Sequence, residues 1–350
     1  MPLTTEDTET GRALAEYASV RENGAGLIDL SSRGRINVSG KEAVQFLNGL
    51  LTNDMKTLLE ETWMPAAFPN AQGRLIASVR VARLNDTSET ISFLIDTEAT
   101  THENLLKTLQ RFTLAGDFRV QDVGKETAHY TVQGNRADVI VQSVFGDAPI
   151  NISENGATTV PWNDTEVTII RATHTAAKGF DLIVHASRAR ELWQSLFDAG
   201  ATPVGEDVFE VLRIEAGIPR YGVDMDETNV VTETNLDDAV SYTKGCYIGQ
   251  EIIARIKYRG HVAKKLTGLT FDDKVDVTAT NVIRSSDNKD IGRITSATYS
   301  PKLKRTIALG YVKYDYLAAG TSVKVIHNEN ELIAKVTELP FVRDEHSDAG

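Results

Sequence analysis

The hydrophobic pattern of this 350-residue chain changes its period near His261, and this change limits what the chain can fold into. Before His261, short alternating segments are interleaved with stretches whose apolar residues recur every three or four positions, as on one face of a helix. After it, only alternating segments follow, separated by turn-forming residues. The pattern predicts an α+β region and then a small all-β barrel or sandwich. The predicted barrel strands are Lys265–Phe271, Ile291–Tyr299, Thr306–Tyr314, Val323–His327 and Glu331–Thr337.

The elements before this change fit two copies of one supersecondary unit. Strand-like and helix-like segments follow in the order β-α-β-β-α-β, that of a ferredoxin-like, split βαβ unit, within residues 27–125 and again within residues 126–260. A capping box of Ser39 and Glu42 predicts the start of the first helix, and a last helix is predicted over Asp207–Ala216. The two halves share no residue-level identity, so the repeat is one of pattern alone.

These patterns divide the chain into three folded domains and two loose ends. Residues 261–342 form the predicted barrel after the two α+β modules. Residues 1–26 begin with a polar segment rich in Thr and Glu, which we expect to be flexible, with helix only from about Ala13. Residues 343–350 are predicted to be a short polar tail.

The composition argues against several classes of function. The chain has 37 Lys plus Arg against 49 Asp plus Glu, so its net charge of −12 disfavours stable nucleic-acid binding, which needs a basic surface. The single cysteine, Cys246, excludes a disulfide framework and a zinc or iron–sulfur site built from the chain's own thiolates. The seven histidines have no spacing typical of metal ligands, so no metal site is predicted.

The apolar runs and the first residues predict the compartment. No window approaches 18 consecutive apolar residues, so no transmembrane helix is expected. The first residues lack the basic start and apolar run of a secretory signal. A lone thiol suits a reducing compartment. We therefore expect a cytoplasmic protein without a membrane partner.

The charges change sign abruptly at Lys244. Residues 222–243 contain six acids and no base, whereas residues 244–265 contain six bases and one acid. Two solvated stretches that happen to adjoin would give the same pattern. The basic stretch opens, however, with Lys244-Gly-Cys-Tyr-Ile-Gly-Gln-Glu251, which we call the signature segment, and its glycines are typical of sharp turns or close backbone approach.

Two interpretations of Cys246 remain open. At a turn beside Lys244 and near several cations, its thiol pKa would be lowered, and the thiol would be reactive or would touch a ligand. Alternatively, Cys246 is a small buried apolar side chain, because free cysteine is among the most buried residue types.

The signature segment resembles the K-G-C-[YF]-x-G-Q-E motif of the YgfZ family, folate-binding accessory proteins of iron–sulfur cluster assembly. That family shares a superfamily with the glycine-cleavage T-protein, a tetrahydrofolate-dependent aminomethyltransferase. The resemblance implies two ferredoxin-like modules and a C-terminal β-barrel in a ring around a folate-binding channel. Further segments that resemble landmarks of the superfamily are Leu27–Gly34, Phe46–Asp54, Leu212–Pro219, Tyr221-Gly222 and Leu309–Val312.

The chain departs from the residues that the resemblance implies for transfer chemistry. Ala77 and Ser78 stand where the T-protein has a pair of aspartates, and neither can act as a carboxylate base. Thr175-Ala-Ala177 stands where the T-protein has a Thr-Gly-Glu whose glutamate supports folate binding. We therefore expect the aminomethyl-transfer apparatus to be missing.

A folate site can still be predicted from residue types, because a flat pterin with an anionic tail needs apolar walls, amide partners and a cation. Arg255, Lys257 and Arg259 either supply the cation or lie on an exposed strand with alternating charge, and Asn53-Asp54 also suits an ordinary helix end. The predicted folate-binding residues are Asn53, Asp54, Gln72, Arg74, Tyr247 and Gln250. Cys246 is predicted as a functional thiol within a functional surface formed by Lys244, Gly245, Cys246, Tyr247, Gly249, Gln250 and Glu251.

Three functions are compatible with these residues. The signature segment and the missing carboxylates favour a tetrahydrofolate-binding accessory protein of iron–sulfur cluster assembly or repair, which is non-catalytic or weakly catalytic and lacks aminomethyltransferase activity. Such a protein would contact assembly proteins or iron–sulfur enzymes transiently and would affect tRNA modification downstream. The second function is a tetrahydrofolate-dependent aminomethyl- or methyltransferase with a relocated base, Asp54 or Glu251. The third is an interaction scaffold with an empty cleft. The expected cofactor is tetrahydrofolate or a derivative, with no metal bound by this chain alone.

Overall fold

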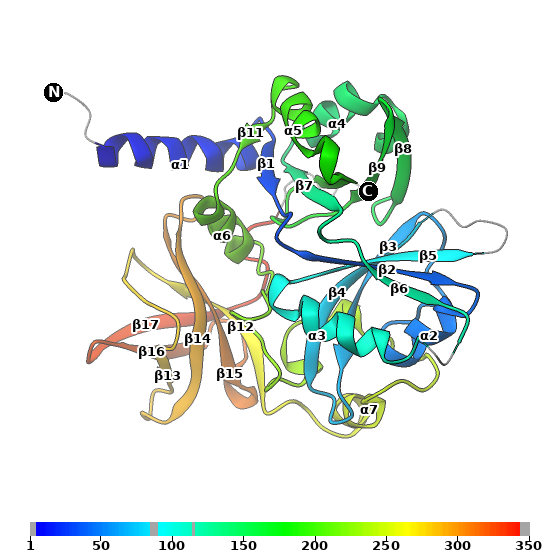
Figure 1. Ribbon diagram of the computed structural model, residues 1–350. Helices are drawn as coiled ribbons and strands as arrows, with labels where there is room; N and C mark the ends of the chain where they lie inside the picture. Colours follow the sequence, from blue (N-terminus) through cyan, green and yellow to red (C-terminus); the bar gives the residue numbers. More distant parts are fainter. Residues whose placement is uncertain (1–4, 85–89, 114–115, 344–350) are drawn as a thin grey trace. The chain divides into compact units, whose positions relative to one another are not determined.

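The computed structural model describes residues 5–84, 90–113 and 116–343 (Figure 1). The chain divides into two units. Unit 1 comprises residues 1–48, 54–65 and 79–210, and unit 2 comprises residues 49–53, 66–78 and 211–350. The division after Glu210 differs from the predicted boundary at residue 260, because the signature segment belongs to the same unit as the barrel.

The first α+β module is ferredoxin-like, as predicted, with one additional strand. Its sheet has the order β3-β4-β5-β2-β6, and β2 pairs antiparallel with both β5 and β6. Without the edge strand β3, this is the strand order of a split βαβ unit. The elements are β2 (Gly34–Gly40), α2 (Ala43–Leu50), β3 (Thr62–Pro69), β4 (Leu75–Arg83), β5 (Ile91–Thr97), α3 (Ala99–Gln110) and β6 (Arg119–Asp122).

The second module repeats this order but takes one strand from elsewhere in the chain. Its sheet has the order β11-β1-β7-β10-β9-β8, and β1 (Gly26–Asp29) pairs parallel with β11 and antiparallel with β7. The predicted first module, which starts at residue 27, therefore wrongly included β1. The other elements are β7 (Thr127–Gln133), α4 (Ala137–Phe145), β8 (Ala157–Trp162), β9 (Thr165–Arg171), β10 (Gly179–His185), α5 (Ala189–Asp198) and β11 (Thr202–Pro203).

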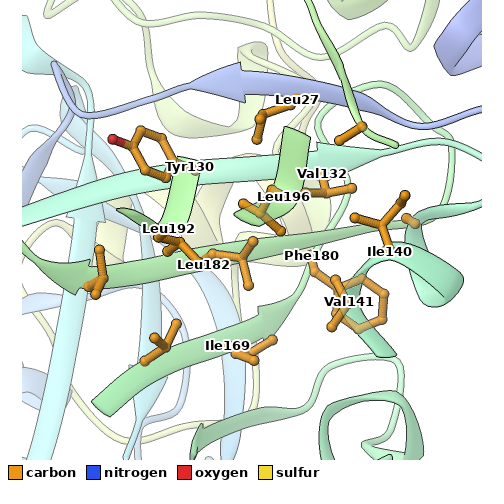
Figure 2. Close-up of a cluster of buried hydrophobic side chains, with 14 of the residues drawn as sticks. Leu27, Tyr130, Val132, Ile140, Val141, Ile169, Phe180, Leu182, Leu192 and Leu196 are labelled. Carbon is orange, nitrogen blue, oxygen red and sulfur yellow. The ribbon is translucent and has the colours of Figure 1, made fainter. Parts of the chain in front are cut away.

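One face of this second sheet packs against α4 and α5 (Figure 2). Val132 on β7 and Leu182 on β10 meet Ile140 of α4 and Leu192 of α5, all of which are buried. Successive residues of a strand point to opposite sides, so the polar neighbours of these strand residues lie on the other face. Those polar residues, among them His129 and Asp181, are buried as well.

The C-terminal β-barrel is confirmed. Six antiparallel strands close in the order β12-β15-β14-β13-β16-β17, and apolar residues such as Leu269, Ile294 and Val325 form its core. All the predicted segments are strands, and only the three-residue β13 was missed. The strands are β12 (Lys264–Phe271), β13 (Val282–Arg284), β14 (Asp290–Ser300), β15 (Arg305–Lys313), β16 (Ser322–His327) and β17 (Asn330–Thr337). Short 3-10 helices cover Ala148–Asn151, Ala186–Arg188, Val231–Glu233, Asp237–Ala239 and Tyr314–Tyr316.

A buried ion pair links helix α6 (Glu206–Glu215) to the barrel within unit 2. Arg213 Nη1 lies 2.7 Å from Asp224 Oδ2, and the side chains of Thr295 and Ser296 on β14 each donate to Asp224 Oδ1 at 2.6 Å. Both charged residues are almost fully buried, so this network holds α6 against the strand. The predicted helix over Asp207–Ala216 is confirmed by α6.

Two predictions about helix starts are wrong. Helix α1 covers Thr5–Arg21. Its C-terminal part is held in place, since Tyr17 and Val20 are buried and Arg21 Nη1 donates to Thr175 O at 2.6 Å. The predicted flexible segment is therefore helical from Thr5, and residues 1–4 and 344–350 lie outside the described residues.

The predicted capping box does not form. Ser39 pairs with Arg119 inside β2, and the carboxylate of Glu42 accepts from the backbone N–H of Asp117 at 2.7 Å. Helix α2 therefore begins later than predicted, at Ala43.

Candidate functional site

The signature segment forms a loop in unit 2 that leads into helix α7 (Gln250–Arg259). Lys244 and Tyr247 are buried, whereas Cys246 and Ile248 are exposed. The interpretation of Cys246 as a buried apolar residue is therefore wrong. Two buried side chains anchor the loop and leave its thiol in solvent.

Lys244 anchors the loop to the chain that follows α2. Its Nζ donates to the carbonyl oxygens of Leu51 at 2.8 Å and Asn53 at 2.7 Å, and it lies 4.9 Å from the centre of the Tyr247 ring. A buried ammonium needs such partners, since an uncompensated charge is costly. Lys244, two residues before Cys246, thus fixes the backbone position of the predicted residue Asn53.

Gly249 brings the loop against the turn between β3 and β4. Its φ is +80°, and a Cβ at this position would lie 2.4 Å from Asn70 O and 3.1 Å from Gly73 Cα. Only glycine permits this approach without a backbone shift. Gly249 therefore lies against the backbone of Asn70 and Gly73.

The β3–β4 turn is held by one asparagine side chain. Asn70 Oδ1 accepts from the backbone N–H groups of Gln72 at 2.9 Å and Arg74 at 3.0 Å. The side chains of Gln72 and Arg74 are exposed, and the Arg74 guanidinium donates to the carbonyl of Thr228. Both side chains are accessible to a ligand from a rigid turn.

The other predicted residues are held by local contacts. Asn53 Nδ2 donates to Asp238 O at 3.0 Å, and Gln250 Nε2 lies 3.5 Å from Lys244 O. Asp54, which belongs to unit 1, accepts from the backbone N–H of Lys56 at 3.1 Å, as expected in a turn after a helix. Within unit 2, Lys244 thus joins the signature segment to the backbone of Asn53, and Gly249, next to Gln250, lies against the turn that carries Gln72 and Arg74.

Tyr247 occupies a core position. Its ring packs with Ala67, Leu75, Val231 and Ile253, and burial raises the pKa of its hydroxyl to about 12. The phenol is therefore neutral at physiological pH, and its ring supports the loop from beneath. Whether it also contacts a folate stays a prediction.

The basic residues after the signature segment lie on a helix, so the predicted strand is wrong. Ile253 of α7 is fully buried and Ile252 and Ile256 are half-buried, a spacing that places one face of the helix inward. Arg255, Lys257 and Arg259 are exposed, as is Glu251 in the first turn.

A second polar cluster, which was not predicted from the sequence, lies on the face of the second sheet opposite its apolar core. The Asp181 carboxylate on β10 lies 2.9 Å from His174 Nε2, and His129 Nε2 and Arg80 Nη1 approach it at 3.5 Å and 3.4 Å. His129 and Asp181 alternate with core residues along their strands. That alternation of polar and apolar residues in buried strands was the available signal.

Opposite charges stabilise this buried cluster in unit 1. Burial alone would raise the pKa of Asp96, but Arg33 at 2.8 Å lowers it below its usual value. Burial would likewise raise the pKa of Asp181, but His174 and His129 hold it well below its usual range. Burial, together with Arg80, lowers the pKa of His174 to about 4, so this imidazole is neutral at pH 7.

A small cavity lies beside these groups, between Trp63, Arg80, Asp96, His129 and Asp181. Its volume of about 10 Å³ is close to the minimum for a single water molecule, too small for a folate. Within the described ranges, no three His, Cys, Asp or Glu side chains are grouped so that they could hold a metal ion. In the same part of the chain, no helix is long and apolar enough to cross a membrane.

Comparisons with known proteins agree on one family. The GCVT N-terminal domain model matches residues 5–244, and the glycine cleavage T-protein C-terminal barrel domain model matches residues 264–343. Proteins named aminomethyltransferase from Thermoanaerobacter pseudethanolicus and Symbiobacterium thermophilum are 27% and 29% identical to this chain. Those alignments cover 94% and 95% of this chain and 89% and 90% of the relatives.

A solved structure has the same fold. The glycine cleavage system aminomethyltransferase T from Bartonella henselae matches with a TM-score of 0.86 at 22% identity, over 94% of this chain and 89% of that chain. These relatives are named aminomethyltransferase, so the resemblance to the YgfZ family remains a prediction.

Proposed function

Because the chain belongs to the glycine-cleavage T-protein family, we propose that it binds tetrahydrofolate or a derivative. The proposal is supported by the linked loops of unit 2 that carry Asn53, Gln72, Arg74 and Gln250. Amide side chains and an exposed guanidinium on a rigid turn suit a ligand with a polar ring and carboxylates. Their position on backbone fixed by Lys244 and Gly249 reduces the ordering cost of binding.

Calorimetric titration with tetrahydrofolate tests this proposal. We expect Arg74→Met to weaken binding about tenfold, since a charge-assisted contact contributes about 1.5–3 kcal/mol. Arg284→Met is the matched control, because Arg284 is a partly exposed arginine on the barrel. A titration of the native chain without heat, repeated by equilibrium dialysis without retention, would contradict folate binding.

The names of the relatives favour a second step, aminomethyl or methyl transfer to the folate, over the accessory function. The residues of this chain weigh against it, because Ala77 is fully buried and Ser78 carries no carboxylate. A transferase would therefore need a relocated base, for which the exposed Glu251 and the half-buried Asp54 are candidates.

Turnover decides between these alternatives. A transferase consumes an aminomethyl or methyl donor together with tetrahydrofolate, and the product folate is measured by chromatography. Glu251→Gln or Asp54→Asn should then abolish turnover by about a hundredfold or more. If a panel of donors gives no turnover with protein that binds tetrahydrofolate, transfer is excluded and folate binding stands.

The accessory function in iron–sulfur cluster assembly is supported by the exposed position of the only cysteine. A thiol held in solvent on an anchored loop can make transient contact with another protein or its cluster. Replacement of Cys246 by Ser in a deletion background, with assays of iron–sulfur enzymes, tests this function. Full rescue by the variant would remove the thiol from the function.

A further inference from the structure

The outer side of α7 and the loop before it form a basic, partly apolar surface that is separate from the residues on which the folate proposal rests. We call it the α7 surface, and all of its residues belong to unit 2. Its members are Tyr242, Ile248, Arg255, Lys257, Tyr258 and Arg259.

The geometry of the helix directs the charged residues outward. Ile253 packs into the core cluster that contains Tyr247, so this side of α7 is fixed. Arg255, Tyr258 and Arg259 follow at spacings of three and four residues and share another face of the helix. Tyr258 is 67% exposed, so its ring is accessible to a partner from solution.

Aromatic and cationic contacts hold parts of this surface in place. The ring of Tyr242 meets that of Tyr258 edge to face at 6.2 Å, and the Lys257 ammonium lies 5.0 Å from the centre of the Tyr242 ring. A preformed aromatic surface loses less side-chain entropy when a partner binds. The α7 surface is thus partly organised before binding.

The charge of the α7 surface contrasts with the rest of the molecule. Residues 251–265 hold five of the 37 basic residues and one of the 49 acidic residues. The rest of the chain therefore has a net charge of −16. Lys265 pairs with Asp237 at 2.7 Å. Among the residues described by the structure, neither Arg255 nor Arg259 forms an ion pair, so both guanidinium groups are available to an outside acceptor.

We propose that the α7 surface docks an acidic segment of another protein. Carboxylates of that segment would meet Arg255 and Arg259, and an apolar side chain would pack against Tyr258 and Ile248, which is 37% exposed. Arginine and tyrosine are enriched among the residues that dominate protein–protein binding energy. A nucleic acid suits this surface less well, because the net charge of −16 on the rest of the chain repels a long polyanion.

A short fluorescein-labelled peptide that alternates pairs of glutamates with leucine is a suitable probe. Its binding is followed by fluorescence anisotropy at low salt, with native protein and an Arg255→Gln/Arg259→Gln variant. We expect the affinity to fall about tenfold in this variant and about threefold in Tyr258→Ala. Arg119→Gln/Lys125→Gln is the matched control, because both residues are exposed basic residues in unit 1, and it should bind within about twofold of the native protein.

Several results would overturn the proposal. Equal losses in the two double variants, with circular dichroism unchanged, would mean that only net charge attracts the peptide. Tighter binding of a labelled uridine oligonucleotide would make the surface a nucleic-acid site, and displacement of the peptide by tetrahydrofolate triglutamate would assign it to a folate tail. Absence of peptide binding by the native protein would exclude the surface directly, and none of these results affects the titration of tetrahydrofolate itself.

Discussion

Lys244 is a charged residue that stabilises the fold, since its buried ammonium donates hydrogen bonds to two backbone carbonyls of unit 2. We expect Lys244→Met to lower the free energy of unfolding by about 2 kcal/mol, because both carbonyls lose their donor. Lys257→Met is a close control, since Lys257 lies at a similar distance over an aromatic ring but is exposed; its effect should stay within about 0.5 kcal/mol. Urea denaturation measures the free energy of unfolding of both variants. Equal losses of stability in the two would contradict the anchoring role of Lys244.

His174 makes stability depend on pH. Its pKa is about 4 in the folded protein against an ordinary value of 6.5, so the unfolded chain takes up a proton first as the pH falls. The contribution of neutral His174 is therefore complete above pH 6.5 and is lost between 6.5 and 4, by about 3 kcal/mol. The pKa values of Asp181 and Asp96 are lowered, so their contributions are lost only below the ordinary carboxylate value of 3.8.

The free energy of unfolding, measured between pH 7 and 4.5, tests this dependence. The His174→Gln variant keeps a polar side chain but cannot titrate, so its curve should fall less steeply than that of the native protein over this range. Parallel curves would show that His174 does not cause the loss.

At the level of single residues, the sequence drew attention to the signature segment but did not predict the placement of its side chains. Glycine turns are compatible with either orientation of Cys246, and only the anchoring of Lys244 and Tyr247 decides it. The buried cluster around Asp181 was missed because its partners, His129 and Arg80, are remote in sequence. Such pairings depend on strand register, which a single sequence does not give.

The loop before α7 depends on close backbone contact between two segments. Gly249→Ala would place a methyl group 2.4 Å from Asn70 O at a positive φ, and we expect it to cost about 2–4 kcal/mol of stability. Gly245→Ala, in the same loop, has no atom within 4 Å of the added Cβ and should change stability by less than about 1 kcal/mol. Thermal unfolding compares the two, and similar melting temperatures would argue that the turn adjusts freely.

At the level of elements, the strands of the barrel and the long amphipathic helices follow from their periodicity. Helix α7 does not, because Arg255, Lys257 and Arg259 alternate with less polar residues as they would on a strand. The burial of Ile253 in the core of unit 2 outweighs that pattern. The placement of β1 in the second sheet also escaped prediction, since a four-residue strand carries no information about its partner.

At the scale of the whole molecule, tryptophan fluorescence reports on one unit only. All three tryptophans, Trp63, Trp162 and Trp193, belong to unit 1, whereas the only cysteine belongs to unit 2. We expect Arg213→Met, which breaks the buried pair with Asp224, to cost about 3 kcal/mol in unit 2. Unfolding followed by far-UV circular dichroism should then begin at lower urea than the transition followed by tryptophan fluorescence.

Two observations complete this test. The Arg171→Met variant removes a partly exposed ion pair with Asp138 in unit 1 and should leave the two transitions coincident. Transitions that coincide in the Arg213→Met protein as well would mean that the two units unfold as one cooperative structure.

The pairing of β1 has a consequence for how this protein is made. Gly26 emerges early from the ribosome, yet its antiparallel partner Gln133 and the parallel neighbour Thr202 are synthesised much later. The second sheet therefore cannot form in the order of translation. Strand β1 stays unpaired while the first module and then β7 are synthesised. Such long-range pairing slows folding and leaves a strand edge open to other chains in the meantime. Expression yield should thus depend on the rate of translation more than it would for two modules folding in sequence.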